Sequence, residues 1–228
     1  SEDKFFPECP KEYFSSLMSA VGAEDAQLLE VIYDPEVLPQ RKSTNASGDI
    51  VAESAVNFYE GVTRSEVEKF YAEMADPNDK TPISYGLNSK LVKGPDGVIR
   101  EEVYKIGGLY GPAIEKICEE LEKAAAVAEN DAQKQYIATL VEYYRSGDLR
   151  LWDKYNIEWL SDTLGTVDFV NGFVEDYNDP LGRKATWEAL VNFKDMEASR
   201  RTEIISENAQ WFEDNSPIDP RFKKKEVK

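Results

Sequence analysis

The hydrophobic pattern of this chain changes period several times, and this change limits the fold more than any other feature of the sequence. Apolar side chains recur every three or four residues within 112–128 and 130–147, as they do on one face of a helix. Residues 167–177 and 185–193 are instead short runs rich in β-branched and aromatic residues, which is typical of strands. A chain with both kinds of segment packs helices against a sheet. We therefore predict an α+β fold, in which an antiparallel sheet is packed with several α-helices.

The same pattern divides the chain into one α+β lobe, residues 1–212, and a polar linker, residues 213–228. Turn residues at 94–97 separate two β-prone runs, and Thr63 with Glu66 forms a capping box before a helix. We expect the hairpin and the later strand pair to contribute to one sheet. The predicted elements are a helical region 1–80, a hairpin 83–106, helices 112–163, a strand pair 167–193 and a helix 195–212.

The composition limits the partners of the chain. Of its 228 residues, 41% are hydrophobic, which is enough for a sizeable core. Lys and Arg total 27 against 44 Asp and Glu, so the formal net charge is −17. Such a surface repels phosphate backbones and anionic lipids, and no run approaches the about 18 apolar residues of a membrane span, so we expect no nucleic-acid or membrane partner. The expected location is the cytoplasm, with the periplasm as the alternative if an export signal precedes the sequence.

Histidine is absent from the sequence. Ser-His-Asp and Cys-His catalysis use an imidazole as the proton shuttle, and the usual catalytic zinc sites include at least one histidine ligand. These chemistries are excluded for this chain alone. Carboxylate, tyrosine or lysine chemistry remains, as does a hard-cation site or no chemistry at all, and we expect no catalytic residue and no metal ligand here. Cys9 and Cys118 lie far apart, so two free thiols are a simpler expectation than one disulfide.

The densest polar cluster follows the first predicted strand of the 167–193 pair. Successive side chains of a strand point to opposite faces, so we expect Phe173, Glu175 and Tyr177 on one face. A carboxylate beside a phenol suits peptide capture, because the carboxylate can bind a terminal ammonium group and the phenol can donate a hydrogen bond to a carbonyl oxygen. The predicted substrate-binding residues are Glu175, Tyr177, Asn178 and Asp179.

Two other interpretations of this cluster remain open. Asp179 and the proline after it suit a type I or II turn at an exposed strand end, and composition and spacing alone favour this turn over a site. Glu175 and Asp179 could also form a hydrolytic pair of carboxylates, which glycosidases hold about 5–10 Å apart. With 44 acidic residues in the chain, however, such pairs arise readily by chance.

Three stretches of the sequence resemble one family of enzymes. VDFVNGFVEDYNDPLG (167–182), WEALVNFKD (187–195) and NAQWFEDNSP (208–217) closely resemble the bacterial form of dipeptidyl peptidase III, the zinc exopeptidases of peptidase family M49. The resemblance implies two lobes, of which the lower has a β-barrel-like core and holds the peptide. It also implies that Glu175 binds the free amino terminus of the substrate and that Tyr177 reaches toward the scissile carbonyl. This assignment favours substrate binding over the turn.

The zinc-binding motif of that family, His-Glu-x-x-Gly-His, does not occur in the sequence. The resemblance therefore implies a fragment, namely the non-catalytic, substrate-binding lobe of a zinc-dependent enzyme that removes dipeptides from peptide amino termini. Zinc is expected in the full-length protein and not in this chain, which is predicted to be inactive alone. Its expected partners are short peptides and the missing catalytic lobe of the same polypeptide. The alternative is a stand-alone acidic protein-interaction module without catalytic activity.

Overall fold

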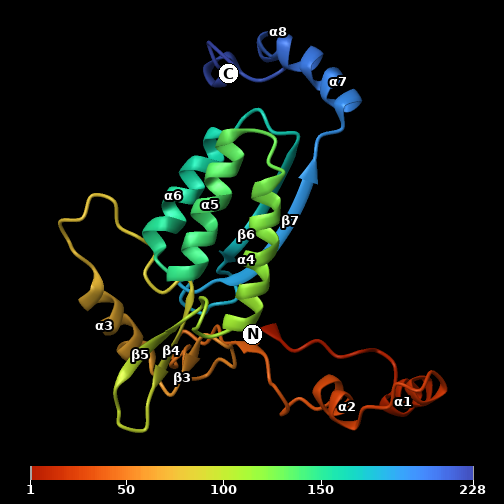
Figure 1. The fold of residues 1–228 in the computed structure, drawn as a ribbon, viewed down its shortest axis with the longest axis vertical. Helices are drawn as coiled ribbons and strands as arrows, with labels where there is room; N and C mark the ends of the chain where they lie inside the picture. The colour runs from red at the N-terminus through yellow and green to blue at the C-terminus, as the bar shows by residue number, and fades with distance from the viewer. Residues whose placement is uncertain (1, 228) are drawn as a thin grey trace.

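A computed structural model of the chain, which describes residues 2–227, shows a mixed α+β fold (Figure 1). Three helices form a layer at its centre, and a pair of antiparallel strands lies along this layer (Figure 1). These central elements are α4 (Gly111–Ala126), α5 (Asp131–Ser146), α6 (Leu149–Ser161), β6 (Val167–Glu175) and β7 (Thr186–Phe193). The predicted α+β class is therefore confirmed.

Short polar residues set the ends of the central helices. The side chain of Asn130 accepts a hydrogen bond from the backbone N–H of Gln133 at the start of α5, and Gly147, with φ 75°, ends that helix. Asp148 then caps α6 by accepting from the N–H of Arg150 at 2.9 Å. Because only Gly147 and Asp148 separate the two helices, α5 and α6 are antiparallel neighbours (Figure 1).

Aromatic residues fill the core between the helices and the strand pair. Tyr136, Tyr143 and Tyr144 of α5 are almost completely buried. The ring centroid of Trp152 in α6 lies 5.2 Å from that of Tyr143. Phe173 of β6 lies beside Tyr144, and its burial stabilises the fold by about 1.5–3 kcal/mol relative to an exposed side chain.

A second, smaller core lies between helix α3 (Arg64–Met74) and a three-stranded sheet. The helix begins with the predicted capping box, since Thr63 and Glu66 each accept a backbone hydrogen bond from the other. The sheet contains the predicted hairpin in a shorter form, with an additional strand parallel to its first strand. Its strands are β3 (Tyr59–Glu60), β4 (Ser89–Lys93) and β5 (Ile99–Val103).

The prediction that the hairpin and the strand pair form one antiparallel sheet is wrong. They belong to separate sheets, and residues 2–227 form no closed barrel. β4 lies between β3 and β5, and it pairs with neither β6 nor β7. A backbone hydrogen bond of 2.9 Å from the N–H of Ala185 to the carbonyl of Leu87 connects the two regions instead. A third sheet pairs β1 (Glu2–Asp3) with β2 (Arg41–Lys42).

The first two helices lie apart from the central body (Figure 1). They are α1 (Lys11–Ala20) and α2 (Ala26–Tyr33), in the region predicted to be helical. The rings of Phe14 and Tyr33 pack at a centroid distance of 6.1 Å and hold the two helices together.

The last helices also extend away from the centre, beyond β7 (Figure 1). The predicted helix 195–212 is divided at Asn208 into α7 (Met196–Glu207) and α8 (Ala209–Asn215). The predicted linker thus includes the end of α8, followed by the short 3-10 helix η1 (Pro220–Phe222). Large apolar side chains on α7 and α8 are exposed to solvent, among them Ile204, Ile205, Trp211 and Phe212.

Replacement of Gly172 by Ala is expected to destabilise the fold, because a Cβ at this position in β6 would lie 2.3 Å from Cη2 of Trp152. Relief of this overlap requires a shift of the strand or of the buried ring, so we expect the free energy of unfolding to fall by about 1–3 kcal/mol. Urea denaturation followed by tryptophan fluorescence measures the change. Val191→Thr, at an exposed position of β7, is the control and should remain within about 0.5 kcal/mol of the unmodified chain. A free energy of unfolding of Gly172→Ala equal to that of the unmodified chain would contradict the close packing of β6 on α6.

Candidate functional site

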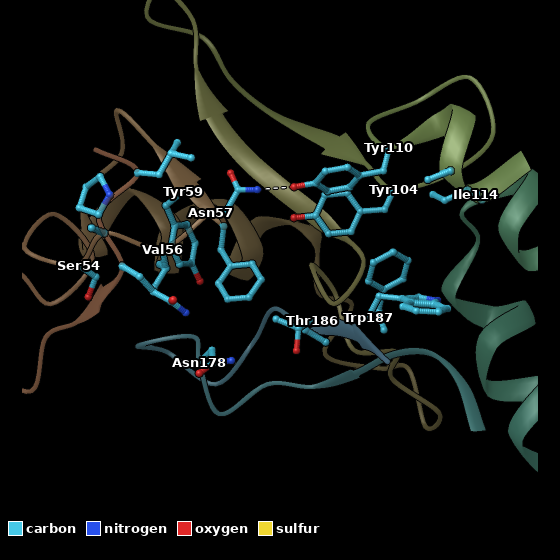
Figure 2. Close-up of a pocket in the computed structure, with 18 of the residues that line it drawn as sticks. Ser54, Val56, Asn57, Tyr59, Tyr104, Tyr110, Ile114, Asn178, Thr186 and Trp187 are labelled. Atoms are coloured by element: carbon cyan, nitrogen blue, oxygen red, sulfur yellow. Dashed lines mark hydrogen bonds between the residues drawn. The ribbon is translucent and has the colours of Figure 1, made fainter. Parts of the chain in front are cut away.

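A cavity of about 980 Å³ lies where the small sheet and the strand pair meet the start of α4 (Figure 2). Its walls come from residues 38–40 and 54–59, from the first two turns of α4, and from β6, β7 and their connection. Most of the lining side chains are apolar or aromatic, and a few amide and hydroxyl groups lie among them. A concave site of this size and composition is typical of small-ligand binding.

Packed aromatic rings form one wall of the cavity. The ring centroid of Tyr104 lies 5.2 Å from that of Tyr110 and 4.9 Å from that of Phe173. Burial raises the pKa of Tyr104 above its ordinary value of 10.0. Tyr110 precedes α4 in the left-handed conformation, with φ 61°, and its hydroxyl accepts a hydrogen bond from the side-chain amide of Asn57 (Figure 2).

The four predicted site residues have different surroundings. Asn178 lies in the wall of the cavity. Glu175 is half-buried at the end of β6, where its backbone carbonyl accepts a hydrogen bond of 3.1 Å from the hydroxyl of Thr186, another cavity residue. The side chain of Tyr177 is 60% exposed, whereas Asp179 is only 1% exposed. The structure therefore brings Glu175 and Asn178 to the cavity region and buries Asp179 beneath it.

The prediction that Phe173, Glu175 and Tyr177 share one face of a strand is wrong. A β-bulge interrupts β6, because Phe173 pairs with Trp187 whereas Glu175 pairs with the adjacent Thr186. Such a bulge interrupts the regular alternation of side chains. Moreover, β6 ends at Glu175, which leaves Tyr177 in the turn that follows. The substrate-binding roles of Glu175 and Tyr177 remain predictions.

Asp179 organises the turn between β6 and β7. Its Oδ2 accepts hydrogen bonds from the hydroxyl of Tyr59 at 2.9 Å and from the backbone N–H groups of Arg183 and Lys184 at 2.8 and 2.9 Å. Its Oδ1 accepts a further one from the N–H of Leu181 at 3.3 Å. Since Tyr59 lines the cavity, its hydrogen bond to the buried Asp179 orients a cavity residue. The turn considered from the sequence is present, but its carboxylate is buried rather than exposed.

A second buried charge, Lys184, lies in the same turn and is 0% exposed. Its Nζ donates to the hydroxyls of Tyr71 and Ser89 at 2.7 and 3.0 Å and to the backbone carbonyls of Ser89 and Gly86 at 2.8 and 3.2 Å. Both hydroxyls donate in turn to Oε1 of Glu101, at 2.8 and 2.5 Å. Burial lowers the pKa of Lys184 to about 8, although the carboxylate of Glu101 opposes this shift.

Sequence reasoning missed Lys184 and the aromatic wall of the cavity. Lysine side chains are almost always solvated, and nothing in the sequence around Lys184 indicates that this one is buried. Its acceptors lie about a hundred residues earlier in the chain, at Gly86 and Ser89. Tyr104 and Tyr110 flank the end of the hairpin, where aromatic residues usually serve as core. The sequence therefore contains no signal that separates cavity residues from core residues.

Within residues 2–227, no group of three or more Cys, Asp or Glu side chains is arranged to hold a metal ion. The helices in this part of the chain also lack the length and apolar composition that a bilayer crossing requires. Cys9 and Cys118 are free thiols, as predicted, and burial raises the pKa of Cys118.

Comparison with known proteins identifies the family. The sequence pattern described as "Peptidase family M49" matches residues 46–228, well over half of the chain. This chain belongs to peptidase family M49. The resemblance noted in the sequence is thereby confirmed.

Relatives within family M49 are considerably longer than this chain. The Rattus norvegicus protein "Dipeptidyl peptidase 3" is 32% identical over 117 residues, which are 51% of this chain and 16% of the rat protein. Dipeptidyl-peptidase III from Corallococcus sp. strain EGB is 25% identical with a TM-score of 0.50, and the match covers 75% of this chain and 30% of that one. DPP III from Caldithrix abyssi shares the fold, with a TM-score of 0.56 at 24% identity over 74% of this chain and 31% of its own.

Asp179→Ala is expected to lower the free energy of unfolding by about 2–4 kcal/mol, because the hydroxyl of Tyr59 and two backbone N–H groups lose their acceptor inside the protein. Chemical denaturation measures this loss. Asp176→Ala is the matched control, since the side chain of Asp176 is exposed in the same turn. Similar stability of the two variants would contradict the structural role of the buried carboxylate.

Lys184 also makes stability depend on pH. Its pKa is about 8 in the fold and 10.5 ordinarily, so between these values the unfolded chain binds more protons than the folded chain. The contribution of this group to the free energy of unfolding therefore rises as pH increases through this window. Denaturation at about pH 7 and about pH 9.5 should show a larger increase for the unmodified chain than for Lys184→Met. An identical pH dependence of both proteins would refute the lowered pKa of Lys184 in the fold.

Proposed function

We propose that this chain is the substrate-binding part of a dipeptidyl peptidase of family M49 and that it binds the amino-terminal end of short peptides. The observation that carries the proposal is the position of the cavity. It adjoins the end of β6, where the family resemblance assigns Glu175 to the amino terminus of the substrate. Membership of family M49 supports a peptide as the ligand. Assignment to the bacterial branch of the family is part of the same proposal.

The chemistry of the cavity suits a peptide. Side-chain amides of Asn57 and Asn178 and the hydroxyl of Thr186 can hydrogen-bond to peptide N–H and carbonyl groups. The aromatic wall provides apolar surface for peptide side chains. The carboxylate of Glu175 would bind the terminal ammonium group, and Tyr177 would approach the peptide from the exposed turn. In this arrangement, Asp179 acts indirectly, through Tyr59 and the shape of the turn.

The zinc that the family resemblance implies does not fit the described residues. The chain contains no histidine, and residues 2–227 present no cluster of metal-ligating side chains. We therefore assign the binding of peptide to this chain and hydrolysis to other parts of a family M49 protein. The exposed apolar side chains of α7 and α8, such as Trp211 and Phe212, support a contact with such a catalytic lobe.

Glu175→Gln tests the proposal in a full-length family M49 protein that contains this sequence. Loss of the carboxylate weakens the bond to the substrate ammonium group, so kcat/KM for dipeptide release from free peptides should fall about tenfold or more. Peptides with an acetylated amino terminus lack this charge, so the variant should discriminate less between free and acetylated peptides than the unmodified enzyme does.

Asp176→Asn is the matched control, because it removes a neighbouring carboxylate that is exposed, and its kcat/KM should be unchanged. Unaltered turnover and unaltered discrimination in Glu175→Gln would remove Glu175 from the site. Absence of any dipeptide release from the unmodified full-length protein would favour the interaction module instead.

A further inference from the structure

The buried cluster around Lys184 is more elaborate than a turn requires. Burial of an ammonium group is costly unless its N–H groups are hydrogen-bonded, and four acceptor atoms lie within hydrogen-bond distance of the three N–H groups of Nζ. The hydroxyls of Tyr71 and Ser89 bridge this ammonium group to the half-buried carboxylate of Glu101. Gly86 is also adapted to the cluster, since its φ is +93° and a Cβ would lie 2.7 Å from Cζ of Tyr71.

Lys184 is the central residue of a row of hydrogen bonds, the seam, between the three-stranded sheet and the β6–β7 pair. Three consecutive residues, 183–185, bind carbonyl groups in the segment 85–89 that leads into β4. The guanidinium group of Arg183 donates to the carbonyl of Tyr85 at 3.1 Å, and the N–H of Ala185 donates to that of Leu87 at 2.9 Å. Between them, the ammonium group of Lys184 binds two further carbonyls. The seam therefore joins regions that share no strand ladder.

This seam leads directly to the cavity. Ala185 at its end lines the cavity, as do the next two residues, Thr186 and Trp187. At the other end, the backbone N–H of Lys184 donates to Asp179, which in turn accepts from Tyr59 of the cavity wall. A displacement of residue 184 would thus move both sides of the proposed peptide site.

We propose that Lys184 is a positioning residue for peptide binding, which acts by clamping residues 183–185 against the segment 85–89. This inference rests on the proposed function, because it concerns the same cavity. The side chain of Lys184 is fully buried beneath the turn, so it acts through Asp179, Thr186 and Trp187 rather than on the peptide. Loss of the clamp should therefore weaken peptide binding more than it slows the bound peptide's reaction.

The test uses the double variant Lys184→Met/Glu101→Gln in the full-length protein. A single Lys184→Met change would leave the carboxylate of Glu101 without its bridged cation, whereas the double variant removes both charges together. We expect KM for short peptides to rise about tenfold while kcat remains within about twofold. The control is Lys90→Met/Glu60→Gln, which removes an ion pair of 2.5 Å between β4 and β3 without touching the seam and should leave KM unchanged.

Tyr71→Phe keeps the ring but removes one bridging hydroxyl, so it provides a milder variant if the double variant is too unstable to assay. We expect its KM to rise about threefold with little change in kcat. An unchanged KM in stably folded variants would overturn the proposal, as would a fall in kcat alone. If Glu175→Gln raises KM and the Lys184 variants do not, the proposed function survives and the positioning role fails. If the Lys184 variants leave KM unchanged and Glu175→Gln leaves both kcat/KM and the discrimination against acetylated peptides unchanged, both fail.

Discussion

The turn between β6 and β7 carries a carboxylate and an ammonium group into the interior of the protein, and the arrangement of the sheets depends on how these charges are satisfied. Asp179 is hydrogen-bonded within the turn and to Tyr59, and Lys184 is hydrogen-bonded to the segment before β4. Within residues 2–227, no strand ladder joins the three-stranded sheet to the strand pair. The connection is made instead by polar contacts of side chains and by the backbone hydrogen bond from Ala185 to Leu87.

The aromatic core packs the central helices against the strands β6 and β7, and it also forms part of the cavity wall. Phe173 packs beside Tyr144 in the core, and its ring also contacts Tyr104 in the cavity wall. This part of the wall is therefore packed directly on the core behind it. Under the proposed function, binding residues held by such a wall would need little reordering when a peptide enters, as suits a part that holds substrate for chemistry performed elsewhere.

Much of the fold follows from local patterns in the sequence. The cap at Thr63 begins a helix as predicted, and Asn130 and Asp148 begin α5 and α6 in the same way, because a cap depends on hydrogen bonds to residues two or three positions away. The predicted strand pairing is correct within the hairpin and within the pair β6–β7, because the strands of each pair are neighbours in sequence. The parallel strand β3 was missed, and the assumption of a single sheet failed, because no local pattern reports which edges of a strand are free.

The candidate site likewise has features that follow from the sequence and features that depend on tertiary contacts. The sequence by itself determined the element types, the family resemblance and the exclusion of histidine chemistry, since these depend on residue identity and short-range spacing. Only the tertiary structure decided that a bulge separates Phe173 from Glu175, that Asp179 is buried, and that Lys184 lies among acceptors from a distant segment. Burial and hydrogen bonding of these groups arise from contacts between segments far apart in the chain, and such contacts exist only once the chain has folded.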